Sequence, residues 1–255
     1  MRRHYGIREA WLFLKDQWRA LTEKEMDFLD VFDNYDEYWA SGFRFEQYWA
    51  LGLNIAKLIE DWFDPGSTVL DVGIGNGQIS EYLIKSKKVK LTGLDISEVA
   101  CQKANELGIK TIIRDINNVG LDLEQDQLYD YILLSEVLEH ILFPKRILIE
   151  ASHHTKKGIV VTMPNVAYMK WRIQLIRGYF PRQSFTHTHF WSIKDFELFC
   201  KALDIKILDF RAFLPEPLLI FKNLLAFQQA WLLAGKGAVS AGTATDQRHT
   251  SNPSM

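Results

Sequence analysis

The chain has few cysteines and no long apolar run. Its two cysteines, Cys101 and Cys200, lie in apolar helical patterns outside any C-x-x-C pair, which suits a reducing compartment and buried structural thiols. No run of 18 apolar residues is free of charge, so we expect no membrane span. The basic start MRRHYGIREAW is not followed by the apolar core of a secretion signal. The sequence therefore predicts a cytoplasmic protein.

The chain also lacks a strong charge of either sign. Its formal net charge is -2, which gives no reason to expect nucleic acid or an anionic membrane as a partner. The apolar fraction of 47% and the charged fraction of 24% are ordinary for a globular protein. A length of 255 residues allows one large domain, or one domain with an appendage.

One stretch, TVLDVGIGNGQIS at residues 68–80, carries the clearest local pattern. Its first residues predict a short buried strand with Asp71 near the end, and from Gln78 the pattern becomes helical. Three glycines alternate between the two elements: Gly73, Gly75 and Gly77. Glycine permits positive φ and a close approach of backbone to a ligand, and free N–H groups at a helix start suit an anion. The stretch therefore predicts the first half of a βαβ unit with a ligand at its turn.

The glycine spacing and two later acidic residues narrow the ligand. A dinucleotide fingerprint reads G-x-G-x-x-G, but Gln78 stands where its last glycine belongs, which disfavours a nicotinamide-dependent oxidoreductase. Asp95 ends the next predicted strand and Asp115 follows the one after it. An acidic residue about twenty positions past the turn can accept both hydroxyls of a ribose. Asp95 can instead cap the following helix, although Ser97 is better placed for that.

This pattern resembles motif I and the acidic strand ends of class I S-adenosylmethionine (SAM) methyltransferases. In that family the glycine turn passes under the methionine part of SAM. The second acidic residue binds the adenine amine, and the residue after it packs on the ring. The resemblance implies SAM as the cofactor and the following cofactor-binding residues: Asp71, Gly73, Gly75, Gly77, Asp95, Ile96, Asp115, Ile116 and Ser135.

Residues 1–64 are helical in pattern and rich in aromatic residues, and we interpret them as an N-terminal helical cap. We expect most of these aromatics to pack on the main domain. The functional alternative is a lid, because class I methyltransferases often close the SAM pocket with N-terminal helices, and aromatic faces attract a sulfonium. The lid candidates are Tyr35, Tyr38, Trp39 and Arg44, of which Tyr38 and Arg44 join the predicted cofactor-binding set.

Three histidines are the candidate catalytic residues. The fourth predicted strand, residues 130–136, is followed by a predicted helix that begins at VLEH and carries Glu139 and His140, where open α/β sheets place ligands. His187 and His189 follow the fifth predicted strand. We expect His189, before His187 and His140, to act as a general base, because histidine titrates near physiological pH. The alternatives are loop histidines satisfied by backbone groups and a helix-start carboxylate.

The triplet His187-Thr188-His189 raises the question of a metal. No cysteine or third histidine stands near it at ligand spacing, although His153 and His154 lie elsewhere in the chain. The expected metal site is therefore none.

The C-terminal half narrows the family. The runs PNVAYMKWRIQLIRGYFP and HTHFWSIKDFELFCKALDIKILDF resemble the MetW family of methionine-biosynthesis proteins. The shared features are P-N, W-R-x-x-L-x-x-R-G, a histidine before an aromatic-Ser/Thr-Ile element, and a D-F helix. The match runs from roughly Thr68 to Leu233. The first 60-odd residues are extra relative to that family, and the segment between Pro181 and His187 is shorter than its pattern.

These patterns predict an α/β three-layer sandwich, with a seven-stranded, mostly parallel Rossmann-like sheet and the cap. The resemblance to MetW implies that residues 228–233 form an antiparallel last strand, although their spacing also fits a helix. The expected parts are a cap (1–64), a SAM-binding domain (65–235) and a disordered tail (236–255). The resemblance implies methyl transfer from SAM to an O or N nucleophile of a small-molecule metabolite, a reaction that depends mainly on alignment. It also leaves an alternative, a SAM-binding partner of a biosynthetic enzyme such as homoserine acyltransferase, without turnover of its own.

Overall fold

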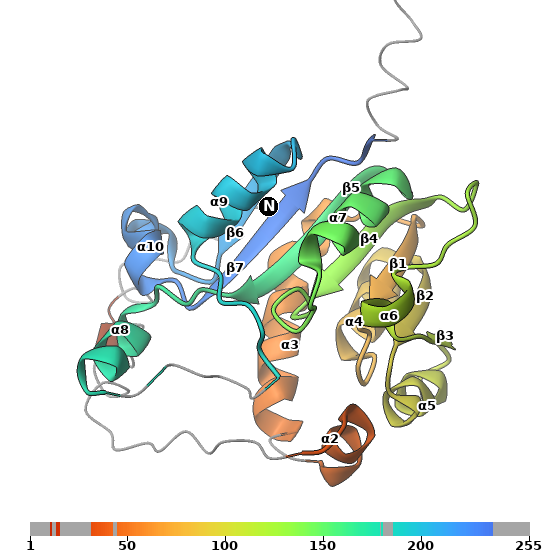
Figure 1. Cartoon of the computed structure of the whole chain (residues 1–255), viewed down its shortest axis with the longest axis horizontal. Coiled ribbons are helices and arrows are strands. Elements are labelled where there is room, and N and C mark those ends of the chain that lie inside the picture. Colours follow the sequence, from red (N-terminus) through yellow and green to blue (C-terminus); the bar gives the residue numbers. More distant parts are fainter. Residues whose placement is uncertain are drawn as a thin grey trace, which may run out of the picture.

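A seven-stranded sheet runs through the centre of the computed structural model, which describes residues 11, 14, 15, 32–42, 45–178, 180 and 186–236, with only the backbone at 45–50 (Figure 1). Its order is β3-β2-β1-β4-β5-β7-β6. The strands are β1 (Thr68–Val72), β2 (Lys90–Asp95), β3 (Lys110–Ile113), β4 (Tyr129–Ser135), β5 (Thr155–Pro164), β6 (Ile207–Ala212) and β7 (Gln228–Leu233). Strand β7 is antiparallel to both neighbours, whereas the pairs among β1 to β5 are parallel. The predicted sheet is confirmed.

Helices cover both faces of the sheet, because side chains along each strand alternate between two cores. Val69 and Leu133 point into a core shared with α3 (Phe45–Ile59) and α4 (Gln78–Lys87). Leu70 and Ile132 point into the opposite core, with α7 (Pro144–His153) and α9 (Ile193–Ala202). Figure 1 shows α7 and α9 on one face and α3 on the other. The three predicted layers are present.

The remaining helices are short or lie at the edges. They are α2 (Tyr35–Ser41), η1 (Glu60–Trp62), α5 (Glu98–Glu106), α6 (Ile116–Val119), α8 (Met169–Ile176), η2 (Glu216–Phe221) and α10 (Lys222–Leu225). Both cysteines are free and buried. Within the described part of the chain, no helix is both long enough and apolar enough to span a membrane.

The segment after β4 differs from the sequence prediction. No helix begins at Val137; the chain turns, with His140 N–H donating to Val137 O at 2.9 Å, and α7 starts only at Pro144. Glu136 adopts a φ of 56°, and its N–H is held by Thr162 O at 2.9 Å. This left-handed residue breaks the helical path that the VLEH pattern favoured.

Most of the first 31 residues of the predicted cap lie outside the described residues, and its last part belongs to the main fold. Ile55, Ile59 and Trp62 are buried in the core beneath the sheet, so α3 is a structural helix of that layer. Helix α2 is separate and lies near α5, with Asn34 as its N-cap. The predicted tail from Lys236 onward falls almost entirely outside the described residues.

Candidate functional site

A cavity of about 970 Å³ opens at the carboxyl edge of the parallel strands. Its wall combines the ends of β1, β2 and β4, the loops that follow them, and helix α2. Edges of this kind are where open α/β sheets bind ligands, and the volume lies at the upper end of the range of small-molecule sites. The cavity is therefore the candidate site.

The glycine turn forms one side of this cavity. Gly73, Gly75 and Gly77 have φ values of 72°, 56° and 75°, which side-chain-bearing residues rarely adopt. A Cβ on Gly73 would stand 2.5 Å from Val137 Cγ2, so the absence of a side chain lets β1 and the β4 turn approach. Gly73 and Gly75 line the cavity, whereas Gly77 serves as the N-cap position of α4. The turn is shaped as the sequence predicted.

Asp95 connects the end of β2 to the glycine turn. Its Oδ2 accepts from Gly75 N–H at 2.8 Å and its Oδ1 from Ser97 N–H at 2.9 Å. Ser97 is the N-cap of α5, as expected, yet Asp95 is less free than the sequence implied. Each carboxylate oxygen can accept a second hydrogen bond, and Asp95 is on the cavity wall, so a diol can still be bound. Burial raises the pKa of Asp95 despite these backbone donors.

Asp71 is buried behind the turn. Its Oδ2 accepts from Ser80 Oγ at 2.5 Å, which joins β1 to α4. Burial raises the pKa of Asp71 to about 7; the Ser80 hydrogen bond opposes this rise, and the nearby charge of Asp95 adds to it. Asp71 therefore holds the turn in place and carries a perturbed carboxyl at the cavity floor.

The other predicted cofactor residues also reach the cavity. Ile96 is 42% exposed there, and Ile116 is buried at the start of α6. Asp115 caps α6, accepting from Asn117 N–H at 3.0 Å. Ser135 Oγ is hydrogen-bonded to Thr162 Oγ1 at 2.7 Å, which fixes the end of β4 to β5.

Helix α2 covers the glycine turn. Asp36 Oδ1 accepts from Ser97 Oγ at 2.5 Å and from Val99 N–H at 3.2 Å, which attaches α2 to the start of α5. These hydrogen bonds, that of Ser97 first, lower the pKa of Asp36. The predicted lid residues Tyr35, Tyr38 and Trp39 all line the cavity. Arg44 lies outside the described residues.

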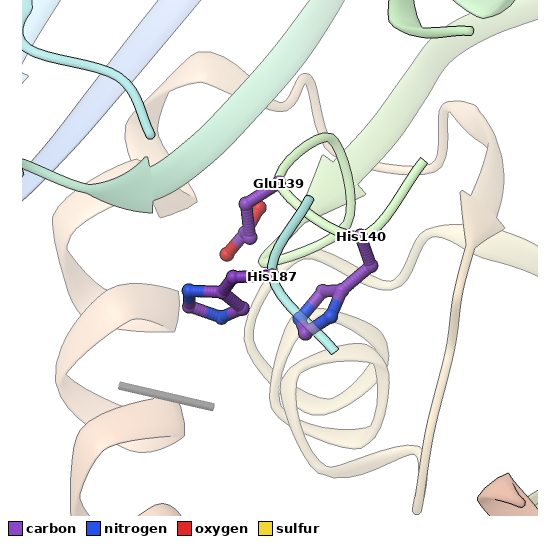
Figure 2. Close-up of side chains that lie close together, drawn as sticks. All are labelled: Glu139, His140 and His187. Carbon is purple, nitrogen blue, oxygen red and sulfur yellow. The ribbon is translucent and has the colours of Figure 1, made fainter. Parts of the chain in front are cut away.

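Two of the three candidate histidines, His140 and His187, meet at the wall of the same cavity. Figure 2 shows the side chains of Glu139, His140 and His187 close together. The ring centroids of the two histidines are 4.5 Å apart. His189 is different: its ring stacks on Trp191 at 5.7 Å, and it is absent from the wall of the main cavity. The structure therefore brings His140 and His187 to the site and leaves the preferred candidate, His189, beside it.

Burial gives the three titratable side chains of this corner unusual pKa values. Burial lowers the pKa of His140 to about 4, and burial together with His140 lowers that of His187 to about 3. Burial, with Glu136 nearby, raises the pKa of Glu139 well above its usual range. Imidazoles with such low pKa values are poor proton acceptors at neutral pH, so neither histidine suits the role of a general base.

Two acidic residues near the site were not singled out from the sequence. Glu136 Oε1 accepts from Thr162 Oγ1, and its Oε2 from Gln228 Nε2, both at 2.9 Å, while burial raises its pKa to about 7. Asp36 is hydrogen-bonded to Ser97 at the start of α5, 61 positions away in the sequence. The position of Glu136 directly after a buried strand could have identified it from the sequence. No sequence pattern marked Asp36.

Comparison with known families agrees with this geometry. The model of the family "Methionine biosynthesis protein MetW" matches residues 54–228. A mitochondrial ubiquinone biosynthesis O-methyltransferase from Candida albicans is 27% identical over 123 residues, covering 45% of this chain and 38% of that protein. The corresponding enzyme from Nitrosomonas europaea is 32% identical over 95 residues, covering 36% and 40%. The chain thus spans about two fifths of the length of these two relatives.

Solved structures show the same fold. The plantazolicin methyltransferase BpumL has a TM-score of 0.60 at 17% identity, covering 88% of this chain and all of that one. The magnesium protoporphyrin IX methyltransferase of Synechocystis PCC 6803 has a TM-score of 0.55 at 15% identity, covering 87% and 94%. Both structures contain S-adenosylhomocysteine. The chain thus has the class I SAM-dependent methyltransferase fold.

Proposed function

Because this chain belongs to the MetW family, we propose that it is a SAM-dependent methyltransferase acting on an O or N nucleophile of a small-molecule metabolite. The observation that carries the proposal is the cavity bounded by the Gly73–Gly77 turn and the Asp95 carboxylate. These features lie at one edge of the sheet and suit a nucleoside with a charged amino-acid arm.

The residues present fit SAM. The unused lone pairs of Asp95 suit the ribose hydroxyls, and Ile96 and Ile116 offer apolar surface for the adenine. Asp115 stands beside Ile116 with a carboxylate for the exocyclic amine. Gly73 and Gly75 bring the backbone of the turn to the cavity wall, where the methionine part would lie, with Asp71 behind them. Ser135 and Tyr38 complete the proposed binding set.

SAM supplies a methyl carbon on a sulfonium, which a lone pair of the acceptor can attack. The protein's contribution is to hold the acceptor in line and to exclude water. His140 and His187 lie in the same cavity as the turn and are the groups we assign to the acceptor side. A hydroxyl is the first acceptor to test, since the relatives above are named O-methyltransferases.

Cofactor choice is the first test. Titration calorimetry should detect binding of SAM and of S-adenosylhomocysteine, and no binding of NAD. Asp95→Ala should weaken SAM binding by about 1.5–3 kcal/mol, the cost of a lost hydrogen bond to a charged group. Asp126→Ala removes an exposed carboxylate in the loop before β4 and should bind as the wild type. Binding of NAD in place of SAM contradicts the proposal.

Turnover is the second test, measured as S-adenosylhomocysteine formed from SAM with panels of phenols, aliphatic alcohols and amines. Acceptor-dependent formation supports the enzyme. Tight SAM binding without turnover on any panel member, together with co-purification of a biosynthetic enzyme, favours the alternative of a SAM-binding partner protein.

A further inference from the structure

The carboxylate of Glu139 is an unusual polar group for the interior of a protein. The residue is 2% exposed, and among the described residues neither carboxylate oxygen has a hydrogen-bond partner. An unpaired buried carboxylate is costly to a fold, because nothing replaces the water that it gave up. Repulsion from Glu136 adds to this cost. Such a group is suited to a cation.

Two imidazoles face this carboxylate. One oxygen of Glu139 and one ring nitrogen of each of His140 and His187 all lie within 4.8 Å of one another (Figure 2). Bonds of about 2.0–2.1 Å around a tetrahedral zinc ion would place such atoms roughly 3.3 Å apart. Side-chain rotations that move the donors by about 1–1.5 Å would therefore complete the arrangement.

We propose that Glu139, His140 and His187 bind a divalent transition-metal cation, with Zn²⁺ as the best match, and leave one coordination position open to the cavity. Two imidazoles and one carboxylate form a donor set that favours zinc-like cations over magnesium or calcium, which prefer oxygen alone. Three protein ligands with one open position are typical of zinc sites that take part in chemistry.

The two segments that carry the ligands are held against each other. Thr188 N–H and His189 N–H both donate to Glu139 O, at 2.7 and 3.0 Å, so the residues after His187 are attached to the β4 turn. Thr188 Oγ1 donates to Glu139 O and to Ile141 O, each at 3.2 Å. The backbone therefore fixes His187 opposite Glu139 without help from a metal.

The ring of His140 is oriented by a neighbour of His187. Thr186 Oγ1 lies 2.8 Å from His140 Nδ1. When Nδ1 donates to this hydroxyl, Nε2 carries the free lone pair and becomes the ligand atom. Outer hydrogen bonds of this kind are common at metal-bound histidines, because they fix both tautomer and ring orientation.

The open position gives the cation a role, which rests on the proposed function. An acceptor hydroxyl held there would lose its proton more easily: the O–H bond breaks, the proton passes to solvent, and the electron pair stays on oxygen as the attacking nucleophile. The site would thus favour hydroxylated acceptors over amines. Two histidines that are poor bases on their own become useful as ligands.

The direct test uses the full chain after chelator treatment. Calorimetry with Zn²⁺ should show one site, and Co²⁺ should give visible d–d absorption bands of a low-symmetry site. Glu139→Gln and His187→Asn should each weaken Zn²⁺ binding by about 100-fold or more, since even outer-sphere changes cost roughly 10–100-fold. His189→Ala is the matched control from the same segment, and should bind Zn²⁺ as the wild type does.

Thermal unfolding separates a lost ligand from a damaged fold. Zn²⁺ should raise the melting temperature of the wild type and of His189→Ala, and leave that of Glu139→Gln unchanged. Without metal, Glu139→Gln should melt no lower than the wild type, because the buried carboxyl that it replaces has no hydrogen-bond partner to lose. The proposal is overturned if the wild type binds neither Zn²⁺ nor Co²⁺, binds only Mg²⁺, or binds equally well in both ligand variants.

SAM titrations run in parallel distinguish the two proposals. Stoichiometric Zn²⁺ binding by a chain that does not bind SAM leaves the metal site standing and removes the methyltransferase. SAM binding without any transition-metal binding removes the metal site and leaves the methyltransferase proposal standing.

Discussion

The indole ring of Trp39 lies over Gly75 so closely that a Cβ at position 75 would stand 2.7 Å from Cζ2 of the ring. Trp39 belongs to α2 and Gly75 to the glycine turn, so helix and turn share one wall of the cavity. Lys103 Nζ donates to Trp39 O at 2.6 Å, which holds the same residue from the side of α5. The contact makes α2 part of the candidate SAM site.

Gly75→Ala should therefore disturb the site in two ways, through backbone strain and through a clash with Trp39. Alanine at a φ of 56° costs about 1–2 kcal/mol, and its methyl would also displace Trp39. Gly108→Ala is the matched control, since Gly108 has a φ of 78° and open space around it. In urea titrations both variants should lose stability, but Gly75→Ala alone should lose SAM affinity, by about tenfold or more. Equal SAM affinity in the two variants would mean that the turn tolerates a side chain.

A second prediction concerns the attachment of α2. Asp36→Ala removes the acceptor for Ser97 Oγ and Val99 N–H, so amide exchange in residues 32–42 should become faster. Glu37→Ala, on the same helix, removes only the acceptor for Asp33 N–H and should change this exchange far less. In the wild type, SAM should slow exchange in the same segment, as measured by mass spectrometry. If neither SAM nor Asp36→Ala changes the exchange rate in this segment, α2 is a surface helix with no role at the site.

Asp71 gives a pH prediction with a definite sign. Its pKa is about 7 in the folded protein, against an ordinary value of 3.8, so between these pH values only the folded state keeps the proton. Stability is therefore highest below about pH 4 with respect to this group, and falls as pH rises toward 7. The fall can reach about 4 kcal/mol, at roughly 1.4 kcal/mol per pKa unit. In Asp71→Asn this decrease in stability should be smaller than in the wild type, as measured by urea titrations at pH 4, 5.5 and 7.

Asp130→Asn is the control of opposite sign. Burial alone would raise the pKa of Asp130, but hydrogen bonds from Thr68 and the charge of Lys157 outweigh it and lower the pKa. Asp130→Asn should thus lose stability mainly at neutral pH. The pKa of Glu136 is also about 7, so part of the loss of stability with rising pH should remain in Asp71→Asn. If the loss is as large in this variant as in the wild type, Asp71 is ionised in the folded protein.

The sequence predicted the fold better than the catalytic side of the site, for a physical reason. Val69, Leu70 and the glycines act through local backbone preferences and period-two burial, which a sequence displays directly. Even β7 was predicted with its observed bounds, by family resemblance against a helical period. The grouping of Glu139 with His187, by contrast, depends on a backbone contact between distant segments. No local pattern reports such a contact.

The last prediction separates the histidines by turnover. The sequence analysis placed His189 before His187 and His140 as the candidate base, because all three follow strands at the carboxyl edge of the predicted sheet. In the structure His187 lines the main cavity and His189 stacks on Trp191 outside it. His187→Ala should therefore reduce turnover with a hydroxyl acceptor by about 10²-fold or more, because it removes a ligand of the cation proposed to activate that hydroxyl.

His189→Ala should reduce turnover much less, since it removes a packing contact with Trp191 and no group in the cavity. SAM affinity should stay within a factor of a few in both variants, because neither residue belongs to the proposed SAM-binding set. The measurement is initial rate at saturating SAM, alongside the binding constant for S-adenosylhomocysteine. If His189→Ala is the more damaged enzyme at unchanged SAM affinity, the acceptor lies on the Trp191 side of the segment, and the order read from the sequence is the right one.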